Sequence, residues 1–297
     1  MKNFNTKKRI LVTGGTGFIG SSIVENLTKN YSTVFALGRE LKSWSPKSVV
    51  ENFVSFDLIS DDITIFDKID TIVNCCSLID NEVGLKSWDS FYKANCLTVK
   101  RLVENLEFNQ FIQLSTGSIF SVKNNEYIVN PKSYYGLSKY LSDQFLKINS
   151  NQLQKYQTVI FRLPIIVGKN SKRGIVYEFL QSAINNEDIE IFGDGQNFRN
   201  ILHVSSFVNL VELAINNSSK LKNYNEFFVG SSNSIKIIDI AKSILQNLAS
   251  TSRINCLNDK QFHNFDSFVD ISKITSILSY NPPSSDESLH QYLCELK

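Results

Sequence analysis

A tyrosine and a lysine four residues apart, Tyr135 and Lys139, are the side chains best suited to proton transfer in this sequence. Residues 134–148 show helical spacing, so the two side chains lie on one face, about one turn apart. A lysine cation beside a phenol favours the phenolate and lowers a pKa that starts near ~10. Tyr135 would then exchange a proton with a hydroxyl or carbonyl group at neutral pH. A surface tyrosine near a surface lysine is common, so the surrounding sequence must decide.

A glycine-rich turn near the start of the chain supplies that context. Ile10–Val12 is a short apolar run typical of a strand buried on both faces, and residues 19–27 follow as an amphipathic helix. Between them lie glycines at positions 14, 15, 17 and 20. A turn without Cβ atoms approaches phosphates closely, and the helix N-terminus offers unpaired N–H groups. In this setting the turn predicts a dinucleotide site, with tight packing as the alternative.

Strand-like and helix-like segments alternate over the first 168 residues. Further strands are expected at 33–37, 53–56, 70–76, 111–114 and 158–163, and helices around 91–103 and at 134–148. This alternation predicts right-handed β–α–β units, and therefore an α/β fold with a doubly wound parallel sheet covered by helices on both faces. Ligands of such sheets bind at the carboxyl ends of the strands. The candidate residues lie at or just after these ends.

The pattern loosens beyond Gly168. Helices are expected at 174–185, 207–215, 235–248 and near Leu289, and strands at 189–192, 201–204 and 227–230. We expect residues 1–168 plus about 201–230 to form a dinucleotide-binding domain. Residues of about 169–200 plus 231–297 would form a smaller, mostly C-terminal substrate domain.

Composition and charge exclude several classes of protein. The 297 residues are 42% apolar and 20% charged, and the net charge of +2 is too small to indicate nucleic acid or a membrane surface. No stretch approaches the ~20 apolar residues of a membrane span, and none resembles a signal peptide. The five cysteines show no metal-ligand spacing, and two of them are adjacent. This usage favours reduced thiols in a cytoplasmic protein without a metal site.

Three motifs together carry a family resemblance. They are Thr-Gly-Gly-Thr-Gly-Phe-Ile-Gly from position 13, Ser115–Thr116 at the end of the fifth strand, and Tyr-Gly-Leu-Ser-Lys from Tyr135. They strongly resemble the extended short-chain dehydrogenase/reductase family, in particular its NAD-dependent epimerase/dehydratase branch, which acts on nucleotide sugars. The match covers nearly the whole chain. It implies a Rossmann-type fold, a nucleotide-sugar substrate, and a homodimer through the helices near Leu97 and Leu141.

The resemblance also implies roles for matching residues. Thr116, with Ser115 as the neighbouring alternative, would hydrogen-bond the reacting oxygen of the substrate. Tyr135 would be the catalytic acid/base, and Lys139 would bind the nicotinamide ribose and depress the tyrosine pKa. Arg199 would face a substrate phosphate. The implied cofactor-binding residues are Gly14, Thr16, Gly17, Phe18, Ile19, Gly20, Arg39, Asp57, Leu58, Cys75, Cys76, Ser77, Asn95, Tyr135, Lys139 and Pro164.

Two departures from the family pattern narrow the function. Dehydratases of this branch carry Asp and Glu directly after the threonine, where this chain has Gly117 and Ser118, so dehydration is disfavoured. An acid at the end of the second strand would hold the ribose 2′-hydroxyl of NAD and repel a 2′-phosphate. This chain has Gly38 and Arg39 there, and an arginine pairs well with a phosphate. NADP(H) is therefore favoured over NAD(H).

A net reductase consumes its cofactor, whereas an epimerase returns the hydride and gains nothing from NADPH. The sequence thus favours an NADPH-dependent reductase of a nucleoside-diphosphate-linked 4-keto-6-deoxy sugar, for surface polysaccharide biosynthesis of the O-antigen type. The first alternative is an NAD-dependent nucleotide-sugar 4-epimerase. The second is a non-catalytic regulator that senses NAD(P).

Overall fold

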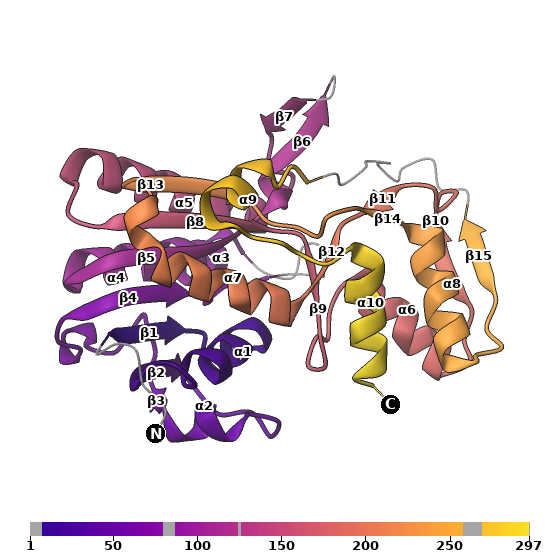
Figure 1. Ribbon diagram of the computed structural model, residues 1–297, viewed down its shortest axis with the longest axis horizontal. Coiled ribbons are helices and arrows are strands. Elements are labelled where there is room, and N and C mark those ends of the chain that lie inside the picture. Colours follow the sequence, from indigo (N-terminus) through magenta and orange to yellow (C-terminus); the bar gives the residue numbers. More distant parts are fainter. Residues whose placement is uncertain (1–7, 80–86, 124–125, 258–268, 297) are drawn as a thin grey trace. The chain divides into compact units, whose positions relative to one another are not determined.

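The computed structural model describes residues 8–79, 87–123, 126–257 and 269–296. Internal contacts divide the chain into two compact units: Met1–Arg162 with Val208–Phe227, and Leu163–Phe207 with Phe228–Lys297 (Figure 1). The division of labour predicted for the two parts of the chain, cofactor binding and substrate binding, stays a prediction.

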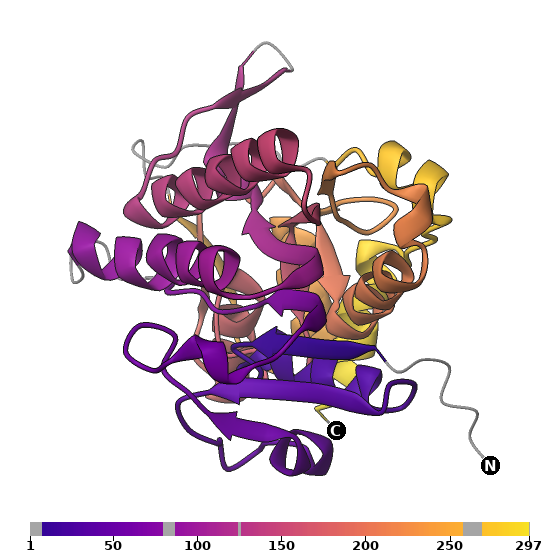
Figure 2. The ribbon, with the colours of Figure 1, turned by 90° about the vertical axis from the view of Figure 1, so that its left-hand side faces the viewer.

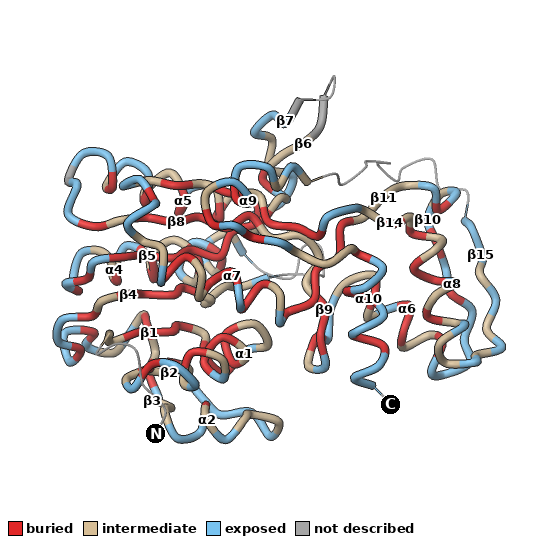
Figure 3. Tube along the Cα trace, viewed as in Figure 1, coloured by how far each residue is buried: buried red, intermediate tan, exposed pale blue. Residues whose placement is uncertain are grey.

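The first unit is built on a seven-stranded sheet with the strand order β13-β8-β5-β4-β1-β2-β3. These strands are β1 (Arg9–Thr13), β2 (Thr33–Gly38), β3 (Phe53–Ser55), β4 (Ile69–Asn74), β5 (Phe108–Thr116), β8 (Gln157–Leu163) and β13 (Tyr224–Phe228). β1 pairs in parallel with β2 and β4, β2 with β3, and β4 with β5. β1, β4, β5 and β8 are buried over most of their length (Figure 3). The predicted α/β class with a doubly wound parallel sheet is confirmed.

Helices cover both faces of this sheet (Figure 2). The longer elements are α1 (Phe18–Leu27), a continuous segment of α3 (Trp88–Phe91), the π-helix η2 (Tyr92–Leu97) and α4 (Thr98–Asn105), α5 (Tyr134–Leu153), and α7 (Val204–Asn216). The shorter ones are α2 (Lys47–Glu51), η1 (Ile63–Ile65), η3 (Gly117–Ile119) and η4 (Ser218–Lys220). On one face, Leu102 of α4 and Leu146 of α5 pack in one cluster with Ile72 and Phe111 of the sheet. On the other, Asn26 of α1 donates to Glu212 of α7 at 2.7 Å.

The second unit combines short strand pairs with helices. β9 (Ile165–Val167) pairs in parallel with β12 (Ile201–His203), β10 (Ile189–Phe192) pairs in parallel with β15 (Ile254–Leu257), and β11 (Phe198–Arg199) is antiparallel to β14 (Ile235–Lys236). The helices are α6 (Ile175–Ile184), α8 (Ile237–Leu248), α9 (Ser272–Leu278) and α10 (Ser285–Cys294). Leu180 of α6, Ile240 and Ile244 of α8, and Leu289 of α10 lie in one buried cluster.

Several elements differ from the sequence prediction. The interval between Thr116 and Tyr135, for which the sequence predicts no helix or strand before residue 134, contains a hairpin of β6 (Phe120–Lys123) and β7 (Glu126–Val129), which projects from the sheet (Figure 1). The strand predicted at 227–230 is β13, at Tyr224–Phe228. Helix α9 and strand β15 had no counterpart in the prediction. Both are short, and the burial pattern of β15 lacks the alternation that marks a strand in sequence.

Candidate active site

The glycine turn after β1 is folded so tightly that side chains have no room in it. Gly14 has a φ of +61°, and a Cβ there would lie 2.9 Å from the backbone nitrogen of Cys76. A Cβ on Gly20 would lie 2.2 Å from the backbone oxygen of Gly14. The N–H of Gly17 donates to that same oxygen at 2.9 Å. Closely packed glycine backbone therefore shapes the cradle at the start of α1, which suits the close approach of a dinucleotide pyrophosphate.

The segment after β4 closes one side of the cradle. The N–H of Cys75 donates to the backbone oxygen of Thr13 at 3.1 Å, and the N–H of Cys76 donates to Thr13 Oγ1 at 3.3 Å. Cys75, Cys76 and Ser77, all predicted to contact cofactor, thus begin directly beside the turn that holds Gly14. Burial raises the pKa of the Cys75 and Cys76 thiols, so both are neutral at physiological pH.

Asn95 is buried on the π-helix η2, and its side-chain amide forms hydrogen bonds within the protein. Its Oδ1 accepts from the N–H of Leu78 at 2.7 Å, and its Nδ2 donates to the backbone oxygen of Leu78 at 3.0 Å. Nδ2 also donates to Ser138 Oγ at 2.9 Å. Asn95 therefore ties the segment after β4 to helix α5. The structure thus gives Asn95 a role in holding these two elements together, and its contact with the cofactor stays a prediction.

The end of β2 excludes side chains at one position. A Cβ on Gly38 would lie 2.5 Å from Thr16 Oγ1, so the acid that commonly ends this strand has no space here. Glu40 pairs with Lys42 at 2.5 Å, and this contact lowers the pKa of Glu40. Arg39 is exposed, and its charge lowers the pKa of Cys76, in opposition to burial. Arg39 and Lys42 are thus two cations that follow the end of β2.

Asp57 and Leu58 follow β3, and their side chains lie in different environments. Asp57 Oδ1 accepts from the N–H of Ile59 at 2.8 Å, which fixes its carboxylate in a turn. The side chain of Leu58 is buried in the apolar core of the first unit. Leu58 can therefore offer a ligand only its backbone, whereas the half-buried Asp57 can also offer its carboxylate.

The two hydroxyl residues that end β5 have different partners. Ser115 Oγ donates to Asp143 Oδ2 at 2.5 Å and accepts from Arg162 Nη1 at 3.1 Å, inside the buried core. Thr116 Oγ1 accepts from the N–H of Ser118 at 3.1 Å. Successive side chains of a strand point to opposite faces, so only one of the pair can face a ligand. This geometry favours Thr116 over Ser115 as the substrate-binding hydroxyl.

Helix α5 brings Tyr135 to the turn that contains Thr116. The helix is capped by Ser133, whose Oγ accepts from the N–H of Gly136 at 3.1 Å. A Cβ on Gly136 would lie 2.9 Å from the backbone oxygen of Ser118, so glycine lets the first turn of α5 approach the turn after β5. Tyr135 and Thr116 therefore belong to two backbones in close contact, and Lys139 follows one helical turn later.

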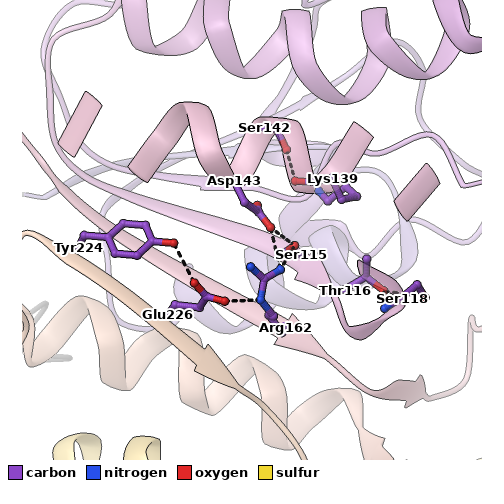
Figure 4. A network of polar contacts seen from close by, with 9 residues as sticks. All are labelled: Ser115, Thr116, Ser118, Lys139, Ser142, Asp143, Arg162, Tyr224 and Glu226. Atoms are coloured by element: carbon purple, nitrogen blue, oxygen red, sulfur yellow. Dashed lines mark hydrogen bonds and ion pairs between the residues drawn. The ribbon is translucent and has the colours of Figure 1, made fainter. Parts of the chain in front are cut away.

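A buried chain of polar contacts lies behind these residues (Figure 4). Arg162 Nη1 donates to Asp143 Oδ2 at 2.8 Å, and Arg162 Nε donates to Glu226 Oε1 at 2.6 Å. Tyr224 donates its hydroxyl to Glu226 Oε2 at 3.0 Å. Arg162 thus makes ion pairs with both Asp143 and Glu226. Asp143 escaped sequence reasoning, although its position four residues after Lys139 places both on one face of α5.

Burial and charge oppose each other in this chain. Burial lowers the pKa of Lys139, which is 1% exposed, while the charge of Asp143 raises it. Burial raises the pKa of Asp143, and the cations Arg162 and Lys139 act against that rise. For Glu226, burial is the largest influence and raises the pKa, but the charge and hydrogen bond of Arg162, together with Tyr224 and Lys147, bring the pKa below its ordinary value. The two anions and two cations thus depend on one another for their charge.

Two residues predicted from the sequence to bind ligands, Pro164 and Arg199, belong to the second unit. Pro164 connects β8 and β9, and Arg199 ends β11, where its Nη1 donates to the backbone oxygen of Phe198 at 2.9 Å. In the same unit, His203 is 1% exposed and its Nδ1 lies 2.7 Å from Ser205 Oγ. The N–H of Ser205 also donates to Nδ1, so the imidazole caps the start of α7. His203 is therefore a packed residue at the end of β12.

Among the described residues, no group of three or more His, Cys, Asp or Glu side chains is placed to hold a metal ion. No helix among them is long and apolar enough to cross a membrane.

Solved structures with the same fold span nearly the whole chain. An epimerase from Methanothermobacter thermautotrophicus superposes with a TM-score of 0.86 at 20% identity, covering 100% of this chain and 94% of that one. The UDP-glucuronic acid 4-epimerase of Bacillus cereus, solved in complex with UDP-glucuronic acid and NAD, gives a TM-score of 0.82 at 20% identity, covering 97% and 98%. At this level of identity the likeness establishes the Rossmann-type fold.

Sequence comparison extends the likeness to the family. A putative UDP-glucose 4-epimerase of Methanocaldococcus jannaschii is 25% identical over 231 residues, which is 72% of this chain and 75% of the relative. The profile of the NAD dependent epimerase/dehydratase family matches residues 10–230. That stretch contains the glycine turn, Thr116, Tyr135 and Lys139. The resemblance inferred from the three motifs is confirmed, and the chain belongs to the NAD-dependent epimerase/dehydratase family.

Proposed function

We propose that this protein is an NAD(P)-dependent enzyme that epimerises a nucleotide sugar at the carbon of a ring hydroxyl, C4 in the simplest case. The observation that carries the proposal is the approach of Gly136, at the start of α5, to the backbone of Ser118, in the turn after β5. We infer from this approach that Tyr135 and Lys139 act together with Thr116. The reductase favoured by the sequence becomes the second candidate, because the relatives and structures compared above are described as epimerases.

The side chains divide the proton chemistry between them. The bound nicotinamide cofactor supplies the hydride acceptor and donor. Thr116 holds the substrate oxygen, and Tyr135 takes the proton from the hydroxyl during oxidation and returns it during reduction. Lys139 carries a positive charge close to Tyr135, which favours the phenolate that the first step needs. In an epimerase the same tyrosine serves both halves of the reaction, so its proton is conserved over one turnover.

The turn after Thr116 disfavours elimination of water. Gly117 has no side chain, and the hydroxyl of Ser118 is engaged with Thr116 Oγ1 at 3.1 Å. Neither can protonate a leaving hydroxyl at neutral pH, because a serine hydroxyl is a very weak acid. We therefore place the enzyme with the epimerases or reductases of its family rather than with the dehydratases.

One observation favours the second candidate, an NADPH-dependent reductase of a nucleotide-linked 4-keto-6-deoxy sugar in surface polysaccharide biosynthesis. Gly38 leaves no room for the acid that would repel a 2′-phosphate, and Glu40 is paired with Lys42. Arg39 is thus a cation with access to that phosphate. We extend this to a preference for NADP(H), and infer cytoplasmic localisation because that is where reduced cofactor and thiols coexist.

An absorbance assay at 340 nm separates the two candidates. The protein is mixed with NAD⁺ or NADP⁺ and a panel of nucleotide-linked hexoses, and separately with NADH or NADPH and nucleotide-linked 4-keto-6-deoxy sugars, and the sugars are then resolved by chromatography. Interconversion of two nucleotide hexoses in the presence of oxidised cofactor, without net formation of reduced cofactor, is the expected result. Stoichiometric loss of NADPH with one keto sugar would instead establish the reductase. Binding of NAD(P) with no turnover of any sugar would favour a cofactor-sensing regulator.

A further inference from the structure

Asp143 is a buried carboxylate that the proposed reaction does not use directly. It lies on α5 one turn beyond Lys139 and is 0% exposed. Its Oδ2 accepts hydrogen bonds from Ser115 at 2.5 Å and from Arg162 at 2.8 Å. Both donors favour the ionised carboxylate and act against the burial that raises the pKa of Asp143. Asp143 is thus held in place by donors from β5 and β8.

Lys139 needs an anion for its own charge. An ammonium group that is 1% exposed is costly to keep protonated unless a negative charge lies nearby. Among the described residues, the ionisable groups whose charges act on Lys139 are Asp143 on α5, Cys96 on η2, and Cys75 and Cys76 after β4. Burial raises the pKa of Cys96 to about 11 and raises that of the other two thiols as well. Asp143 is therefore the group of this set best placed to supply the negative charge, because Arg162 and Ser115 donate hydrogen bonds to its carboxylate.

The same carboxylate reaches the substrate side of the site. Ser115, which it holds through Oγ, immediately precedes Thr116 at the end of β5. A shift of Ser115 would move the backbone that carries the substrate-binding hydroxyl. One buried side chain is thus connected to both Lys139 and the strand end that presents Thr116.

We propose that Asp143 is a positioning residue that keeps Lys139 cationic and fixes the end of β5, held in place by Arg162 and Ser115. The inference rests on the proposed function, because it assigns Asp143 to the tyrosine–lysine chemistry. The direction of the expected effect follows from charge, because without the anion of Asp143 the Lys139 ammonium group loses its proton at lower pH. Tyr135 then loses its cationic neighbour, so turnover declines at the alkaline side of the pH profile earlier than in the parent protein.

The variant Asp143→Asn tests this with Glu226→Gln as its matched control. Both substitutions replace an anion that pairs with Arg162, but only Asp143 acts on the charge of Lys139. For Asp143→Asn we expect kcat to fall roughly tenfold or more at pH 8. The alkaline limb of the pH profile of kcat should move to lower pH by about one unit or more. Glu226→Gln should lose stability without moving that limb.

A second readout is independent of turnover. The affinity for NADH or NADPH, followed by nicotinamide fluorescence, should fall several-fold for Asp143→Asn at pH 9 and match the parent protein at pH 6. Should Asp143→Asn not fold, the double variant Asp143→Asn/Arg162→Gln removes the buried pair together and leaves no unpaired arginine. Unchanged profiles in the folded variant, or equal shifts in Glu226→Gln, would overturn the inference. A parent protein without sugar turnover would overturn the proposed function instead.

Discussion

Tyr135 and Lys139 lie one turn apart on α5, yet their surroundings differ sharply. Tyr135 is half-buried at the start of the helix, whereas Lys139 is almost fully enclosed and depends on Asp143 for its charge. The sequence spacing predicted the pair but not this asymmetry, because burial and the partners of a side chain arise from β5 and β8, which are distant in sequence. For the same reason the sequence does not predict the role of Asp143. The choice of Thr116 over Ser115 as the substrate-binding hydroxyl depends on their hydrogen bonds, which only the structure shows.

At this scale the first prediction concerns the phenol. Tyr135→Phe removes the hydroxyl that exchanges the proton and leaves the ring in place. We expect kcat to fall by a factor of order 10²–10⁴ with little change in cofactor affinity. Steady-state kinetics would measure the fall in kcat, and fluorescence titration with NAD(P)H would measure the cofactor affinity. Turnover within a few-fold of the parent protein would remove Tyr135 from the acid/base role.

The second residue-scale prediction concerns Arg39 and the cofactor. An arginine that pairs with the 2′-phosphate contributes charge-assisted hydrogen bonds of about 1.5–3 kcal/mol, which is roughly a ten- to hundredfold change in affinity. Arg39→Ala should therefore weaken NADPH binding by that factor and leave NADH binding unchanged. Lys29→Ala, an exposed cation at the end of α1, serves as the control in the same titration. Equal losses for both cofactors, or none, would contradict the NADP(H) preference.

At the scale of elements, the strands and helices of the first unit follow from apolar runs and helical spacing, since local pattern determines them. The hairpin β6–β7 does not, because its strands are four residues each and their register depends on pairing with one another. The π-helical turn η2 is likewise set by its neighbours, with Asn95 bonded to Leu78 and Ser138. Elements that are short or shaped by distant contacts were the ones the sequence left open.

Helix α5 gives an element-scale prediction through Gly136. In a helix, alanine normally stabilises relative to glycine by about 1 kcal/mol, but here its Cβ would press on the backbone oxygen of Ser118 at 2.9 Å. Gly136→Ala should push the first turn of α5 away from the turn after β5, costing about 1–3 kcal/mol and at least tenfold in kcat. Gly117→Ala is the matched control, because a Cβ there meets nothing within 4 Å. Thermal unfolding and steady-state kinetics would measure the stability and kcat of both variants. Equal stability and equal kcat in the two variants would contradict the close packing inferred for Gly136.

At the scale of the whole molecule, the helices that the family resemblance assigns to a dimer expose apolar side chains. On α5, Leu141 is 40% and Ile148 is 52% exposed, and Tyr92 on η2 is 42% exposed. Single exposed apolar residues are ordinary, but three on two neighbouring elements form a surface that association would bury. We therefore propose a homodimer through α5 and the α3–η2–α4 segment, which contains Leu97.

The last prediction tests that dimer with a charge placed on its expected centre. Leu141→Asp puts a carboxylate where two copies of α5 would meet, and burying an unpaired charge costs far more than the contact returns. Light scattering after size exclusion should give twice the chain mass for the parent protein and the chain mass for this variant. Val50→Asp is the control, because Val50 is 50% exposed on α2, an element that contacts α1 and does not belong to the proposed interface. A parent protein that runs as a monomer, or a Leu141→Asp variant that stays dimeric, would place association elsewhere or nowhere, and the exposed residues of α5 would then be ordinary surface.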